Sequence, residues 1–160
     1  DFNSLNSKFI PSFQIENVNN NSISNKKTIS NEGVHSSNVN KDIIDWTGSL
    51  ILGSNYPNEY INPLITFSRS LSSKKINLLS GSNYQIKNSL SRSEALKGIT
   101  LWGAYSNFEE LKKGSISIGN FADFVILSKN IMEIDIKLIP STQVIATVLG
   151  GELKYKINIL

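Results

Sequence analysis

Residues 144–157 read VIATVLGGELKYKI, which is an apolar run, a pair of glycines and an alternating stretch. The apolar run over 144–149 predicts one strand, and the apolar–polar alternation over 152–157 predicts another. Gly150 and Gly151 separate the two and can adopt the positive φ angles that a two-residue hairpin turn requires. The stretch therefore predicts an antiparallel β-hairpin.

The segment before the hairpin predicts a third strand and a helix. Residues 121–127 read FADFVIL, which is typical of a strand. Residues 91–94 read SRSE, a capping box in which the Ser91 hydroxyl accepts from the backbone N–H of Glu94 and the Glu94 side chain reaches back. The helix that follows is expected to carry an apolar face and to be weakened by two glycines, by about 1 kcal/mol each relative to Ala. The face consists of Ala95, Ile99, Trp102 and Tyr105, and the glycines are Gly98 and Gly103.

The first half of the chain is less regular. Strands are predicted at 8–14 and 49–53, and a short helix at 42–46, from their apolar residues. Asn62 followed by Pro63 predicts a helix start, with Asn62 as the N-cap and Pro63 at the first helical position. The polar stretches at 16–41 and 72–89 predict loops, and the first of them is expected to be disordered.

Composition and charge limit the functions that this chain can have. Its 160 residues and 17.7 kDa predict one domain, or one small domain and part of another. Cysteine is absent, which excludes disulfides, thiolate metal sites and Cys nucleophiles, and the only histidine is His35. The net charge of +3 comes from scattered lysines, so nucleic-acid binding is not expected, and no apolar run reaches the roughly 18 residues of a membrane helix. No secretory signal is visible and the first residue is Asp1, so we expect a cytoplasmic fragment or processed product.

Several segments together resemble the C-terminal end of the amidohydrolase superfamily, in the branch known as amidohydrolase-3 or exoenzyme-regulator-like proteins. The family reads "GSI-x-PGK-x-ADFVIL" where this chain has residues 114–127, and "TV-x-GG-x-x-x-Y" where it has residues 147–155. Upstream, GSNYPNE at 53–59 and INPL at 61–64 resemble "GSDFPVE…NPL", and IPSFQIEN at 10–17 resembles "IPSVQPTH". The segments SEAL, TLWGAY and FEE, at 93–96, 100–105 and 108–110, fit as well.

This resemblance implies an α/β fold, the C-terminal part of a metal-dependent hydrolase (β/α)8 barrel with its last strands and helices, plus part of a composite β-sandwich. Residues 8–14 would be the sixth barrel strand and residues 49–53 the eighth. Residues 1–90 would form the partial barrel segment, with the disordered loop at about 16–41. Residues 91–160 would form the last barrel helix and the C-terminal sandwich strands. The first five barrel strands would not be in this chain.

The family hydrolyses carbon–nitrogen bonds other than peptide bonds, typically in small-molecule amides and cyclic amides. Zinc-type divalent metals in active members polarise the carbonyl and lower the pKa of a bound water to about 7. The resemblance implies that Asn17 occupies the position of a His ligand and Asn55 that of the Asp that accepts the proton. A carboxamide cannot accept a proton near neutral pH. No catalytic residue, metal ligand or cofactor site is therefore expected in this chain.

Other residues have weaker claims to a function. His35 would be a metal ligand only if the alignment were shifted by a large insertion, so an exposed loop residue is favoured. Asp42 and Asp45 are one helical turn apart and could share a metal, but a solvated helix face is favoured. Glu59 is expected to orient the loop after the turn, and Asp123 to be structural. The predicted core aromatics are Trp102, Phe108, Phe121 and Phe124.

Three interpretations follow. In the first, the chain is a degenerate or fragmentary amidohydrolase that is inactive alone, as the missing strands and the two asparagines favour. In the second, it is the C-terminal part of a longer active amidohydrolase. In the third, it is a non-catalytic module that pairs with a separate N-terminal half or a paralogue. We adopt the first as the working hypothesis.

Overall fold

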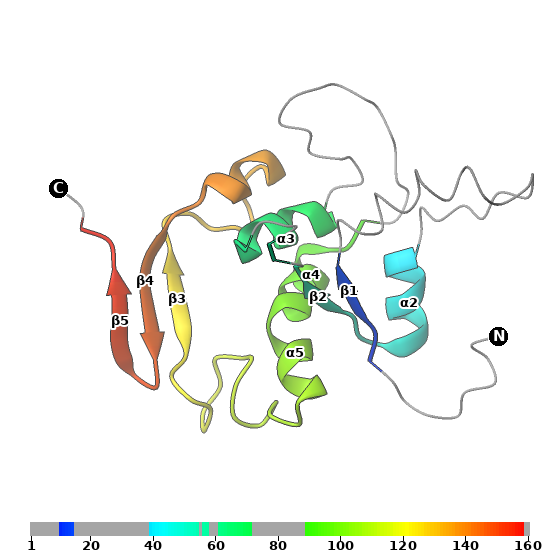
Figure 1. Ribbon diagram of the computed structural model, residues 1–160, viewed down its shortest axis with the longest axis horizontal. Helices are drawn as coiled ribbons and strands as arrows, with labels where there is room; N and C mark the ends of the chain where they lie inside the picture. Colours follow the sequence, from blue (N-terminus) through cyan, green and yellow to red (C-terminus); the bar gives the residue numbers. More distant parts are fainter. Residues whose placement is uncertain (1–9, 15–38, 55, 58–60, 72–88, 159–160) are drawn as a thin grey trace, which may run out of the picture.

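A computed structural model describes residues 10–14, 39–54, 56–57, 61–71 and 89–158 of the chain. It is a mixed α/β structure, as predicted, with a two-stranded sheet and a three-stranded sheet. In Figure 1, the three-stranded sheet and helix α2 lie at opposite ends of the molecule, with the other α-helices between them. The elements in chain order are β1 (Ser12–Gln14), α2 (Val39–Thr47), β2 (Ile51–Gly53), α3 (Pro63–Leu71), α4 (Arg92–Ile99), α5 (Leu101–Ser106), β3 (Phe124–Leu127), η4 (Ile136–Ser141), β4 (Val144–Leu149) and β5 (Glu152–Lys156).

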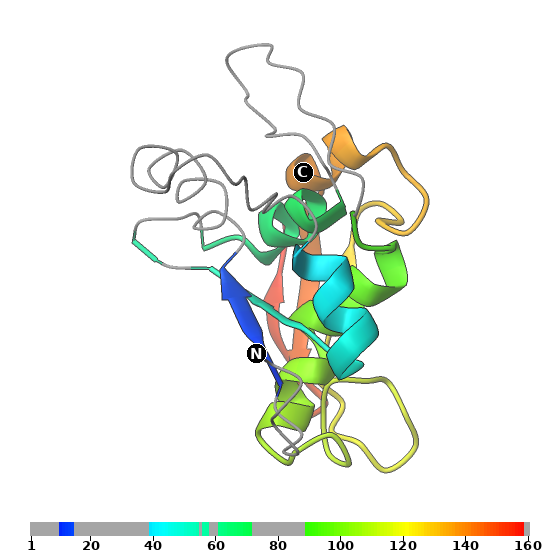
Figure 2. The ribbon, with the colours of Figure 1, turned by 90° about the vertical axis from the view of Figure 1, so that its right-hand side faces the viewer.

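The strands β1 and β2 form a parallel pair, with Phe13 opposite Leu52. Helix α2 lies between them in the chain and beside them in space, as Figure 2 shows. Leu52 of β2 and Leu50, which directly precedes the strand, are both buried in the core. The side chains of Ser12 and Gln14 on β1 are exposed. The pair is thus buried mainly through β2.

The direct pairing corrects the strand numbers that the resemblance implied. In a (β/α)8 barrel each strand lies next to the strand that follows it, so the sixth and eighth strands are separated by the seventh. Here, β1 is hydrogen-bonded directly to β2, and the backbone N–H of Ile51 donates to the carbonyl of Pro11 at 2.9 Å. The assignment of these two segments to the sixth and eighth strands therefore disagrees with the direct pairing of β1 and β2.

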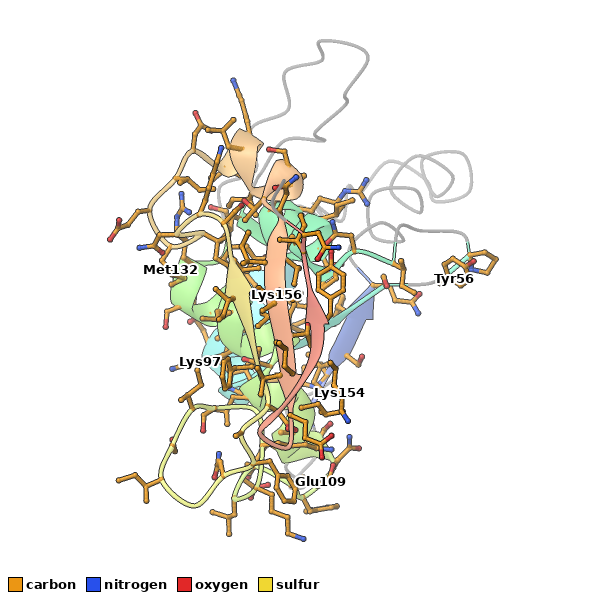
Figure 3. The ribbon with its side chains drawn as sticks, turned by 90° about the vertical axis from the view of Figure 1, so that its left-hand side faces the viewer. Tyr56, Lys97, Glu109, Met132, Lys154 and Lys156 are labelled. Carbon is orange, nitrogen blue, oxygen red and sulfur yellow. The ribbon has the colours of Figure 1, made fainter. Side chains whose placement is uncertain are left out.

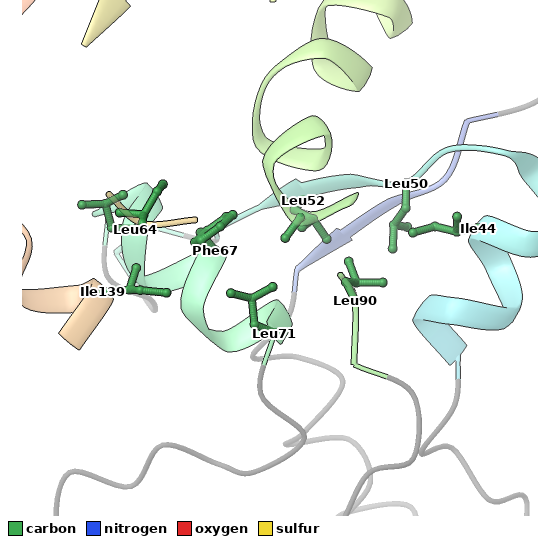
Figure 4. Packing of buried hydrophobic residues seen from close by; sticks show 10 residues of the cluster. Ile44, Leu50, Leu52, Leu64, Phe67, Leu71, Leu90 and Ile139 are labelled. Carbon is green, nitrogen blue, oxygen red and sulfur yellow. The ribbon is translucent and has the colours of Figure 1, made fainter. Parts of the chain in front are cut away.

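The hydrophobic core lies between β2, α3 and α4 (Figure 4). The core contains residues from both 1–90 and 91–160, the two parts into which the sequence was expected to divide. That division of the chain stays a prediction. Phe67, Leu50 and Ile139 are the largest fully buried apolar side chains of the core. The full cluster is Ile44, Leu50, Leu52, Leu64, Phe67, Leu71, Leu90, Ala95, Ile131 and Ile139.

Both predicted helix starts are confirmed. The side chain of Asn62 accepts from the backbone N–H of Leu64 at 2.9 Å, and Pro63 is the first residue of α3. At α4, Ser91 Oγ accepts from the backbone N–H of Glu94, and Glu94 Oε2 accepts from the backbone N–H of Ser91. Each start depends on contacts within four residues, which is why the sequence alone predicts it.

The single helix expected after residue 91 is two helices, α4 and α5, with a break at Thr100. The φ and ψ angles of Thr100 are −134° and −90°, and its hydroxyl donates to the carbonyl of Leu96 at 2.6 Å. This side-chain bond competes with the helical backbone pattern. The predicted face is correspondingly divided, because Ala95 is buried and Ile99 and Trp102 pack against the core, whereas Tyr105 is exposed.

The three-stranded antiparallel sheet has the order β3-β4-β5. The predicted hairpin joins β4 to β5, and Gly150 and Gly151 have φ angles of 59° and 81°. Positive values at both residues match the tight turn that the glycine pair predicts. The third strand is also confirmed, although it starts at Phe124 rather than at residue 121.

Two of the predicted core aromatics are exposed. Phe108 is 93% exposed and Phe121 is 58% exposed, so their assignment to the core is wrong within this chain. Both lie in the segment 107–121 that leads from α5 towards β3. Trp102 packs against the core, and Phe124 is half-buried on β3. The sequence indicated apolar character correctly but could not show what covers each ring.

Candidate functional site

The carboxyl ends of β1 and β2 meet at one edge of the parallel sheet. In barrel enzymes, active sites lie at the carboxyl ends of the parallel strands. In the register of the pair, Gln14 lies opposite Gly53, so both strands end at the same level. The loop that leaves β2 begins with Ser54, which is half-buried. Tyr56 is 68% exposed and projects from this loop (Figure 3). This edge is the candidate site.

Four of the predicted site residues lie outside the described residues. They are Asn17, His35, Asn55 and Glu59. In the sequence, Asn17 follows the end of β1 by three positions and Asn55 follows the end of β2 by two. Because the two parallel strands end together, these positions belong to chain segments that leave the same edge. Their roles stay predictions.

The two aspartates of the possible metal pair belong to α2. Asp45 is exposed on this helix. In the part of the chain that the structure describes, no group of three or more His, Cys, Asp or Glu side chains could hold a metal ion. The side chain of Asp42 lies outside the described part of the chain, so a metal shared by Asp42 and Asp45 stays a prediction.

Asp123 has the structural role that was predicted for it. Its Oδ1 accepts from the backbone N–H of Gly150 at 2.6 Å. The bond joins the residue before β3 to the turn between β4 and β5, and it is supported by the backbone bond from Gly151 to the carbonyl of Ala122 at 3.1 Å. Asp123 therefore fixes the hairpin turn against the start of β3.

Sequence reasoning missed Arg92, which ties α4 to the segment between β3 and η4. Its guanidinium donates to the carbonyl oxygens of Ile131 and Ile134, the second at 2.6 Å. A signal was present, because Arg92 is the first residue of α4, where the helix dipole disfavours a positive charge. An arginine at that position suggests partners outside the helix.

Burial affects the guanidinium of Arg69. Arg69 is in the last turn of α3, and burial lowers the pKa of its guanidinium below the ordinary value. Its position near the helix C-terminus is electrostatically favourable, because the carbonyl groups there carry partial negative charge.

Comparison with known proteins assigns the chain to a family. The model of the protein family described as "Amidohydrolase family" matches residues 26–155. The chain belongs to the amidohydrolase family. Protein LONG AFTER FAR-RED 3 of Arabidopsis thaliana is 32% identical over 130 residues, which are 81% of this chain and 22% of that protein. The chain thus spans about a fifth of the length of this curated relative. No solved structure matches it.

The structure gives a physical reason for one glycine of the amidohydrolase-like segment at 114–127. Gly114 has a φ angle of 89°, and a Cβ there would lie 2.8 Å from the Cβ of Ala104 and 2.9 Å from the Cα of Leu101. Both contacts are with α5. Only glycine allows the loop to turn this closely against the helix.

The side chains that the resemblance aligns with the family's metal site would fit a zinc-type metal poorly. The resemblance would place two of the family's site positions at Asn17 and Asn55, and both side chains are carboxamides. A carboxamide oxygen is a weak ligand for zinc-type ions, which prefer imidazole, thiolate or carboxylate. It also has no basic site for a proton near neutral pH. A site built on these two side chains would therefore lack both a strong metal ligand and a base for the proton of a metal-bound water.

None of the helices in the described ranges is both long enough and apolar enough to cross a bilayer.

Proposed function

We propose that the chain supplies the last strands and helices of an amidohydrolase barrel together with part of its adjoining sheet, and does not hydrolyse carbon–nitrogen bonds by itself. The observation that carries this proposal is the parallel pair of β1 and β2. Parallel sheets are stable when both faces are covered and further strands continue them. In the described residues the parallel sheet has two strands, and β1 exposes Ser12 and Gln14.

The chemistry at the two asparagines supports the same proposal. Hydrolysis by the family needs a base that takes a proton from a metal-bound water. Asn55 stands at that position and cannot act as the base. The inherited activity, hydrolysis of non-peptide carbon–nitrogen bonds, is therefore not expected from this chain alone.

The test is an assay of the purified chain with Zn²⁺, Mn²⁺ or Co²⁺ against N-acyl amides and cyclic amides, with release of amine or ring opening as the readout. The wild-type chain and the variant Asn17→His/Asn55→Asp are compared. A matched variant, Asn20→His/Asn58→Asp, introduces the same side chains at neighbouring positions that do not correspond to the family sites. Metal content after dialysis is measured for all three proteins.

No turnover above the metal-only rate is expected for any of the three, because two restored groups cannot replace the strands that carry the other ligands. Metal-dependent turnover by the wild-type chain would contradict the proposal outright. Turnover by Asn17→His/Asn55→Asp and not by the matched variant would show that these strands are dispensable, which contradicts the proposal as well.

If the chain is the C-terminal part of a longer active amidohydrolase, the upstream strands would restore the other ligands but not Asn17 or Asn55. Hydrolysis by a longer product would then be weak or altered. The same assay on the protein from its natural source, with Asn55→Asp expected to raise turnover, separates this case from the inactive chain.

A second candidate function, a module that pairs with a separate N-terminal half or a paralogue, is favoured by the segment 107–121 that follows α5. It exposes Phe108, Leu111, Ile116 and Ile118 by 83% or more of their surface. Within the same segment, the Oε2 atom of Glu110 is buried and has no hydrogen-bond partner among the described residues. Apolar patches and orphaned polar atoms of this kind mark surfaces that a partner covers.

This candidate predicts that the chain co-purifies with a second polypeptide of roughly 40–50 kDa, the size of a barrel domain with its sandwich. Mass spectrometry must identify that polypeptide as an amidohydrolase that carries the missing strands. A variant with Ile116→Ser and Ile118→Ser should lose it, whereas Ile61→Ser, which changes another exposed side chain, should retain it. Recovery of the chain without such a polypeptide would exclude this function.

A further inference from the structure

We draw no further inference here: the strongest candidate, the exposed apolar patch of Leu111, Ile116 and Ile118 in the loop between α5 and β3, already belongs to the pairing surface proposed above, and nothing in the described part of the chain shows what covers it.

Discussion

At Gly98, helix α4 comes so close to β2 that a side chain has no room. A Cβ at this position would lie 2.7 Å from Leu52 Cγ and 3.0 Å from the carbonyl oxygen of Leu50. Leu52 is buried and the carbonyl belongs to the backbone, so neither can move freely. The sequence presents Gly98 only as a weak point of a helix, and its packing role becomes visible when α4 lies against β2.

Gly98→Ala is expected to destabilise the protein by about 1–3 kcal/mol through overpacking, although alanine is the better helix former. Gly103→Ala is the matched control, because α5 has nothing within 4 Å of a Cβ at that position. It should leave stability unchanged or raise it by up to about 1 kcal/mol. Urea unfolding measures both, and an equal rise for the two variants would contradict the close approach.

Arg92→Met retains the length of the side chain and removes its donors to Ile131 and Ile134. Hydrogen bonds from a charged donor contribute about 1.5–3 kcal/mol, so unfolding should become easier by that amount. Amide exchange between residues 130 and 135 should rise as well. Lys97→Met, an exposed change in the same helix, should alter stability by less than about 0.5 kcal/mol. Identical effects of the two variants would mean that Arg92 does not hold this segment.

At the scale of single elements, prediction succeeded where the cause is local. The capping box at Ser91, the Asn62–Pro63 start and the Gly150–Gly151 turn each depend on a few neighbouring residues. The break at Thr100 was missed, because a hydroxyl bond to Leu96 competes with a helical pattern that continues through the sequence. The exposure of Phe108 was missed because local sequence carries no information on what covers a side chain.

Ser91→Ala tests the contribution of the capping box to α4. Loss of the hydroxyl that accepts from Glu94 should cost about 1 kcal/mol of unfolding free energy. Ser93→Ala, which changes an exposed serine in the first turn, should have an effect below about 0.5 kcal/mol. The two free energies come from urea titrations followed by far-UV circular dichroism. A cost at Ser93 as large as at Ser91 would contradict the assigned cap.

At the scale of the whole molecule, family membership was predictable and the arrangement of strands was not. The motifs at 114–127 and 147–155 are local sequence patterns, and the family match over residues 26–155 confirms the resemblance that they carry. The adjacency of β1 and β2 depends on a crossover of more than 30 residues, for which the sequence gives no register. The candidate site was predictable only as far as the strand ends, because Asn17 and Asn55 lie outside the described residues.

The central claim is that β1 and β2 are part of a larger sheet. Amide hydrogen exchange at Ser12 and Gln14 of β1, whose N–H groups point away from β2 in this register, tests it most directly. Exchange is compared between the isolated 160-residue chain and the protein from its natural source. If further strands cover β1, protection in the natural protein should exceed that in the isolated chain by at least about 100-fold. Equal protection in the two would show that the two-stranded sheet is complete, and would contradict the account.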